Sequence, residues 1–95
     1  MKIYTEKDVK GLKSEGEITL LIEGERNEYK EALKQLNDEF DPIATEFRNK
    51  TLEFEKARQL YNGLRAVYDA KVDVIEREHD HNYNILYGYR RNLCQ

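Results

Sequence analysis

Apolar and aromatic side chains recur at a strict spacing of seven, and this spacing constrains the fold more than any other feature. One series contains Leu33, Phe40, Phe47, Phe54, Tyr61, Tyr68 and Ile75, and a second, three residues further on, contains Leu36, Ile43, Lys50, Ala57, Leu64 and Lys71. Alternating steps of four and three form the a/d seam of a heptad repeat. A solitary helix drifts off a period of seven, whereas a supercoiled pair keeps it. The sequence therefore predicts an all-α fold of paired helices.

Length and composition agree with a small coiled-coil protein. The 95 residues (1–95) are expected to form a single domain, and a chain this short buries only about 60–65% of its unfolded surface, so oligomerisation is a common remedy. Charged residues make up 37% of the chain, well above the roughly 25% of a typical globular domain. A net charge of −3 is too weak to indicate a nucleic-acid or membrane partner.

The sequence lacks the usual marks of export. No apolar run typical of a signal peptide follows the N-terminal lysine, and no stretch approaches the roughly 20 apolar residues that span a bilayer. A single cysteine, Cys94, excludes an intramolecular disulfide and suits a reducing compartment. We expect a cytoplasmic protein with no membrane partner.

Residues 1–24 read as a short N-terminal element. Thr5 followed by Asp8 is typical of a helix N-cap, opening a short helix. Residues 17–23 are ambiguous, because their β-branched content suits a strand that would pair with residues 2–4, whereas Ser14 and Glu17 form a capping-box pattern. Helix is favoured over strand.

Two sites in the rest of the chain carry residues that commonly begin or end a helix. Asp41-Pro42 favours a new helix starting at Pro42, because Asp is a common N-cap and Pro a common first helical residue. We therefore predict a first helix over 25–40, a tight reversal at 37–41 and a long second helix over 42–80. The heptad phase continues through Pro42, so one kinked helix is the alternative.

The second site is Asp80-His81-Asn82, which is expected to end the long helix. Residues 82–95 would then form a tail or a last short helix.

The unequal helix lengths predict a homo-oligomer, most simply a dimer. The second helix would be about 58 Å long and the first about 21 Å, or about 35 Å if it begins at Glu17. The part of the second helix that extends beyond the first would therefore have to pack against another chain. From Leu60 onward the g positions become apolar, which widens the face. The predicted oligomer interface contains Phe47, Phe54, Tyr61, Leu64, Val67, Tyr68, Val74 and Ile75. If Phe54 is fully buried in this interface, Phe54→Ala should lower the free energy of unfolding by about 3–5 kcal/mol.

No residue pattern predicts catalysis, a metal or a cofactor. Glu76 and His79 have the i, i+3 spacing of di-iron ligands, but both lie away from the seam and no further carboxylate is placed to join them, so a solvated helix end is favoured. Lys50, Lys71 and Glu78 on d positions are expected to fix register rather than form an ionic site. No phosphate loop, nucleophile elbow or CxxC pair is present, so an enzyme is not expected.

The C-terminal tail is the candidate partner-binding region. It combines aromatic and guanidinium groups, in Tyr83, Tyr87, Tyr89, Arg90 and Arg91. Packing onto the wide face around 67–75, or contact with a protein partner, is favoured. Stacking on the bases of a nucleic acid or nucleotide is the alternative.

The function predicted from these features is non-enzymatic. A helical-hairpin coiled-coil oligomer would bind an unknown protein as an adaptor or inhibitor, in the manner of a phage or mobile-element accessory protein. The alternative is a nucleic-acid- or nucleotide-binding protein that uses the tail.

Overall fold

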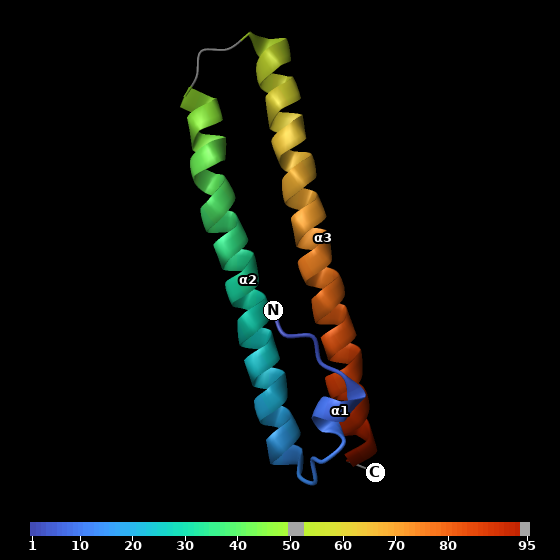
Figure 1. Ribbon diagram of the computed structural model, residues 1–95. Coiled ribbons are helices and arrows are strands. Elements are labelled where there is room, and N and C mark those ends of the chain that lie inside the picture. Colours follow the sequence, from blue (N-terminus) through green and yellow to red (C-terminus); the bar gives the residue numbers. More distant parts are fainter. Residues whose placement is uncertain (50–52, 94–95) are drawn as a thin grey trace.

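The chain folds into an antiparallel hairpin of two long helices with a short helix at its base (Figure 1). The computed structural model describes residues 1–49 and 53–93, with α1 at Glu6–Val9, α2 at Glu15–Asn49 and α3 at Phe54–Leu93. The molecule is a rod of 61 × 18 × 16 Å, and the described residues contain no strand. The predicted all-α helical hairpin is confirmed.

Helix α2 begins at a cap built by Ser14. The Glu17 backbone N–H donates to Ser14 Oγ at 3.3 Å, and the Lys13 backbone N–H donates to the Glu17 carboxylate at 3.3 Å. These bonds satisfy donors that have no partner within the helix. Residues 17–23 are therefore helical, as favoured, and residues 2–4 form no strand with them.

Pro42 lies inside α2, so the predicted reversal at Asn37–Asp41 is wrong. The ranges 25–40 and 42–80 are corrected to Glu15–Asn49 and Phe54–Leu93. Of the alternative of one kinked helix, the passage of the helix through Pro42 is confirmed, but this helix ends at Asn49. Proline removes one backbone hydrogen bond and crowds the carbonyl four residues earlier. Phe40 before it is buried and Phe47 after it is half-buried, so packing on both sides offsets that cost.

The two long helices are nearly equal in length, which corrects the predicted overhang. Helix α2 has 35 residues and α3 has 40, a difference of five. Because the reversal comes after Asn49, the residues that would have been left without a mate face α2. Helix length therefore gives no reason for a second chain, and the homo-oligomer stays a prediction.

The predicted break at Asp80-His81-Asn82 is also wrong, because α3 continues to Leu93. The polar residues there hold the N-terminal segment. Asn82 Oδ1 accepts from the Tyr4 backbone N–H at 2.7 Å, and Asn82 Nδ2 donates to the Lys2 carbonyl at 2.9 Å. His81 Nε2 donates to the Tyr4 carbonyl at 2.8 Å. The polar residues His81 and Asn82 therefore bind the N-terminal segment and do not end the helix.

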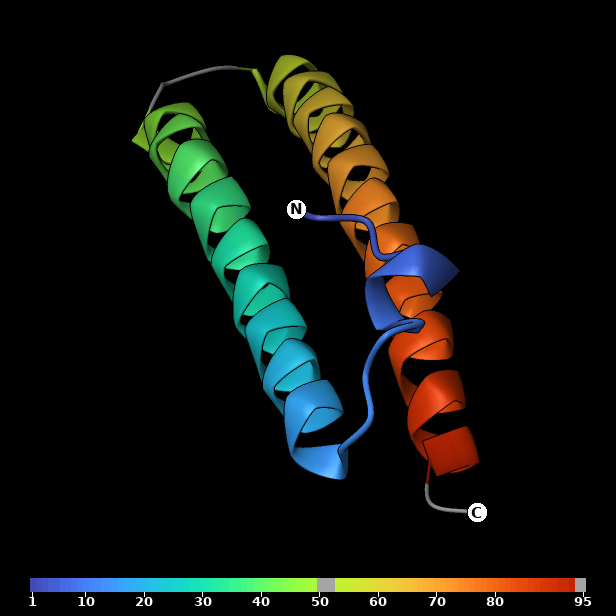
Figure 2. The ribbon, with the colours of Figure 1, turned by 60° about the horizontal axis from the view of Figure 1, so that its bottom comes forward.

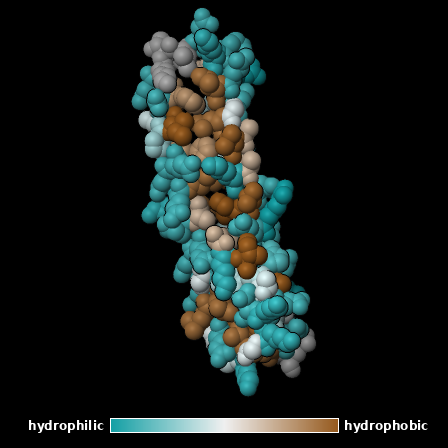
Figure 3. All heavy atoms as spheres, in the orientation of Figure 1, coloured by the Kyte–Doolittle hydropathy of each residue, from teal (hydrophilic) through white to brown (hydrophobic). Residues whose placement is uncertain are grey.

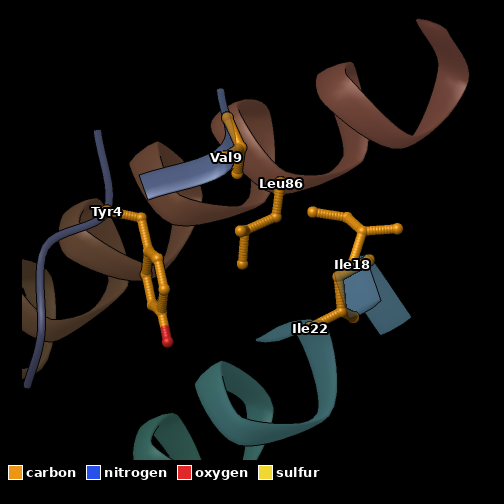
Figure 4. Close-up of a cluster of buried hydrophobic side chains, with 5 residues drawn as sticks. All are labelled: Tyr4, Val9, Ile18, Ile22 and Leu86. Carbon is orange, nitrogen blue, oxygen red and sulfur yellow. The ribbon is translucent and has the colours of Figure 1, made fainter. Parts of the chain in front are cut away.

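The main hydrophobic core lies at the base of the hairpin, where all the elements meet. Figure 4 shows Leu86 of α3 reaching between Val9 of α1 and Ile18 and Ile22 of α2, with Tyr4 beside them. Helix α1 and the N-terminal segment lie along the lower part of α3 (Figure 2). A smaller buried pair, Leu36 and Phe40, lies further up α2. The N-terminal residues thus close the core at one end only.

The upper half of the hairpin leaves much apolar surface in solvent. On the face drawn in Figure 3, hydrophobic side chains gather along the middle of the upper half between hydrophilic flanks. Near the start of α3, Phe54 is 77% exposed and Tyr61 is 49% exposed. Phe54 is therefore not buried within one chain, since no third element among residues 1–49 and 53–93 covers this end, and its burial in an oligomer stays a prediction.

Candidate functional site

A second apolar seam runs along α3, beside the one that packs on α2. It consists of Leu60, Gly63, Val67, Ala70 and Val74, which follow one another at steps of three and four. We call these five residues the α3 stripe. Leu60, Val67 and Val74 are 46%, 51% and 53% exposed, and Gly63 and Ala70 are exposed as well. The stripe is about 21 Å long, since fourteen residues separate its ends.

Large and small residues alternate along the α3 stripe. A Cβ added at Gly63 would meet nothing within 4 Å, and Ala70 carries only a methyl group. Leu60, Val67 and Val74 therefore stand as three knobs with two low points between them. Steps of three and four with alternating size are the pattern that lets another helix seat its side chains between these knobs.

A groove between α2 and α3 adjoins the stripe. Its volume is 620 Å³, and it is lined mostly by apolar side chains: Ala32 and Leu36 from α2, with Val67, Ala70, Val74 and Ile75 from α3. Lys71 Nζ and Glu39 Oε1, 3.4 Å apart, form an ion pair across the groove. The predicted role of Lys71 in helix register is compatible with this pair, whereas Lys50 lies outside the described residues.

The eight residues predicted as an oligomer interface divide into two groups. Phe47, Leu64, Tyr68 and Ile75 are half-buried, whereas Phe54, Tyr61, Val67 and Val74 are exposed. The Tyr68 ring meets Phe40 edge-on with centroids 5.4 Å apart, and the Tyr68 hydroxyl donates to Asn37 Oδ1. Part of the predicted interface is thus the internal seam of the hairpin, and only the exposed part is open to another molecule.

The predicted partner-binding tail is the last part of α3 and is largely engaged within the chain. The Tyr89 hydroxyl donates to the Leu12 carbonyl at 2.7 Å, and Arg90 Nη2 lies 3.3 Å from Glu15 Oε1. The rings of Tyr83 and Tyr87 stack with centroids 4.3 Å apart.

The Tyr87 hydroxyl also accepts from Arg26 Nη2 at 3.1 Å. The tail therefore extends α3 away from residues 67–75, and of its five predicted residues only Tyr83 and Arg91 are exposed.

A pair of a buried carboxylate and a half-buried histidine crosses the hairpin, and no sequence pattern predicted it. Glu25, only 3% exposed, places Oε1 2.7 Å from His79 Nδ1, and the His79 ring stacks on Tyr29 at 3.9 Å. Burial, followed by the negative charge of Glu76, raises the pKa of Tyr29.

This pairing engages His79 with Glu25 rather than with Glu76. Within residues 1–49 and 53–93, no three His, Cys, Asp or Glu side chains are grouped to hold a metal ion.

The docking site of the N-terminal segment was also missed by sequence reasoning. Asn82 is completely buried and occupies the a position that follows Ile75 by seven residues. A polar residue on the seam was the available signal, since such residues usually bond to a specific partner. Tyr4, which it holds, has a raised pKa because of burial, with a further contribution from Glu28.

Comparison of the chain with protein-family models, with curated proteins and with solved structures finds no match. In the described part of the chain, no helix is both long and apolar enough to span a membrane.

Proposed function

We propose that the protein is a non-enzymatic coiled-coil interaction module that binds an α-helix of another polypeptide through the α3 stripe. The observation that supports this proposal is the exposure of Leu60, Val67 and Val74 on one line of a helix that already has its mate. Monomeric proteins rarely leave contiguous apolar patches in water, and such patches often mark interaction sites. A protein that binds a partner without catalysing a reaction would act as an adaptor or an inhibitor.

The shape of the surface supports a helix as the ligand. Apolar residues at steps of three and four, with a groove along one side, match the helix-in-groove mode of recognition. The base core holds α2 and α3 together at the other end, so the upper half presents the stripe on a helix that is already formed. A segment that is already helical loses less conformational entropy on binding than a disordered one.

The tail gives less support to a nucleic-acid or nucleotide ligand. Tyr89 and Arg90 are used in contacts with Leu12 and Glu15. Arg91 alone would release few counterions from a phosphate chain. The α3 stripe is therefore the stronger basis for a function.

A matched pair of charge substitutions tests the proposal. Val67→Glu places a carboxylate on the stripe, whereas Asn62→Glu adds the same charge at an exposed position five residues earlier and off the stripe. Immobilised parent and variant proteins are incubated with extract of the native host, and the bound proteins are quantified by mass spectrometry. Circular dichroism verifies that both variants remain helical.

We expect Val67→Glu to lose bound polypeptides that the parent and Asn62→Glu retain, because a buried unpaired charge is costly. Equal retention by the two variants, together with a parent chain that is a monomer, would contradict the proposal.

A further inference from the structure

We infer that the helix received by the α3 stripe is α3 of a second copy of this chain, running antiparallel. This inference rests on the proposed function and names its partner. It is argued from the stripe itself, which is complementary to its own reverse in size and in charge. Such self-complementarity is what a two-fold symmetric interface requires.

Size complementarity appears when the stripe is laid on a reversed copy of itself so that the two-fold axis crosses α3 at the level of residue 65, midway between Gly63 and Val67. Leu60 then faces Ala70 of the second copy, and Val67 faces Gly63 of the second copy. By symmetry each of these layers occurs twice. Leu60 and Val67 thus each meet a small residue, and a valine side chain occupies the space that is open at Gly63. Large residues opposite small ones allow close packing between helices.

Charge complementarity appears at the two ends of the same alignment. Glu53 faces Arg77 of the second copy, and the aliphatic stem of Lys56 covers Val74 of the second copy. Arg77 also contacts Asp73 of its own helix at 2.6 Å, but its side chain is 78% exposed and can reach a second carboxylate. Long basic side chains commonly cover apolar surface in this way while the charge stays in water.

A parallel alignment fails on the same residues. It would place Lys56 on Lys56, Arg77 on Arg77 and Gly63 on Gly63, which sets like charges together and leaves a void at the glycines. Shifting the antiparallel copy by one heptad would instead set Leu60 against Arg77. The residues therefore favour the antiparallel alignment about residue 65, which forms a four-helix arrangement with the two α3 helices inside.

Sedimentation equilibrium at micromolar concentrations tests the second copy. We expect the parent and Asn62→Glu to sediment as dimers of twice 11.3 kDa. Val67→Glu should raise the dimer dissociation constant by about tenfold or more. A parent chain that sediments as a folded monomer would overturn the inference.

Gly63→Leu separates this packing from nonspecific hydrophobic contact. A Cβ at this position meets nothing within 4 Å in its own chain, and leucine should favour the helix, since glycine is a poor helix former. In a nonspecific association the added apolar surface would strengthen binding. In the dimer inferred here the leucine collides with Val67 of the second copy, so we expect the dissociation constant to rise by about tenfold or more. An unchanged or tighter dimer would refute the alignment.

Disulfide cross-linking tests the direction of the helices, in a Cys94→Ser background. A mixture of Leu60→Cys and Ala70→Cys chains should form a mixed covalent dimer on mild oxidation. Leu60→Cys alone should not, because its two thiols lie about 15 Å apart along the helices. Cross-linking of Leu60→Cys to itself would show parallel pairing and refute the inference.

The two proposals fail separately. If the parent chain is a monomer but Val67→Glu still loses a host polypeptide that Asn62→Glu retains, the second copy is excluded and the interaction module stands. If the parent is a monomer and both variants retain the same polypeptides, both proposals are excluded.

Discussion

At the scale of single residues, a few buried polar side chains determine how the base of the hairpin is assembled. Asn82 replaces an apolar seam residue with two directional hydrogen bonds to the N-terminal segment. Glu25 and His79 cross-link the two long helices at 2.7 Å. Burying such groups is costly unless they are paired. They therefore select one alignment of the N-terminal segment, α2 and α3.

Replacing Asn82 by alanine should lower the free energy of unfolding by about 2–3 kcal/mol, because the buried Tyr4 backbone N–H loses its acceptor. Asn84→Ala, at an exposed site on the same helix, is the control and should change stability by less than about 0.5 kcal/mol. Urea denaturation followed by circular dichroism measures both. Equal effects at the two asparagines would show that the N-terminal segment does not dock as described.

The carboxylate of Asp8 should contribute to the pH dependence of stability. The Thr5 backbone N–H lowers the pKa of Asp8, helped by the Thr5 hydroxyl and Lys2. A group whose pKa is lower in the folded state stabilises the protein above its unfolded pKa of about 4, and this contribution is lost as the pH falls through the folded value. Asp8→Asn should therefore reduce the loss of thermal stability on acidification below about pH 4.

Glu6→Gln is the matched control for this change, because the hydrogen bonds from Thr5 go to Asp8 and not to Glu6. If the two variants show the same melting temperatures across the acidic range, Asp8 has no special role.

At the scale of elements, the seven-residue spacing was sufficient to predict paired helices, because that spacing is meaningful only when a second helix faces the seam. The position of the reversal could not be predicted. Asp41-Pro42 satisfies every local rule for a helix start, yet Phe40 and Phe47 bury enough surface to carry α2 through it. Local rules cannot predict a contact such as that of Phe40 with Tyr68, because the two residues are far apart in sequence.

The candidate site was predicted in part for a similar reason. The apolar g positions were visible in the sequence, so Val67 and Val74 were expected at an interface. The small c positions, Gly63 and Ala70, became meaningful only once α2 was found to occupy the a/d seam and to leave this line of α3 uncovered. The contacts of the tail within the chain could not be predicted, because the residues that Tyr89 and Arg90 contact, Leu12 and Glu15, lie more than 70 residues away in sequence.

Substituting Pro42 tests the continuity of α2. In a helix interior a proline costs about 3 kcal/mol relative to alanine, so Pro42→Ala should raise the free energy of unfolding by about 1–3 kcal/mol. Thr45→Ala, exposed within the same helix, should give only the propensity gain of about 0.5 kcal/mol. If Pro42 instead began a separate helix, its replacement would be neutral or destabilising. Chemical denaturation distinguishes these outcomes.

At the scale of the whole molecule, stability is distributed unevenly along the rod. The N-terminal segment, α1, α2 and α3 meet in the base core around Ile18 and Leu86, whereas above Leu36 and Phe40 the described residues place only α2 and α3 against each other. The upper half is therefore held together mainly by the seam between α2 and α3, and the exposed α3 stripe lies in this half. A protein arranged in this way has a stable end that holds its shape and a less stable end that gains burial on binding.

Hydrogen exchange tests this gradient. In the Val67→Glu variant, which weakens the inferred dimer, amides of residues 57–66 should exchange faster than those of residues 82–90, because local opening of the upper half exposes less buried apolar surface. In the parent protein, raising the concentration should slow exchange in residues 60–74 and leave residues 82–90 unchanged, since a second copy covers only the stripe. Leu86→Ala is the control, because a cavity in the base core should accelerate exchange at residues 82–90. Uniform exchange along α3 in the Val67→Glu variant would contradict the gradient, and concentration-independent exchange in the parent would contradict coverage of the stripe.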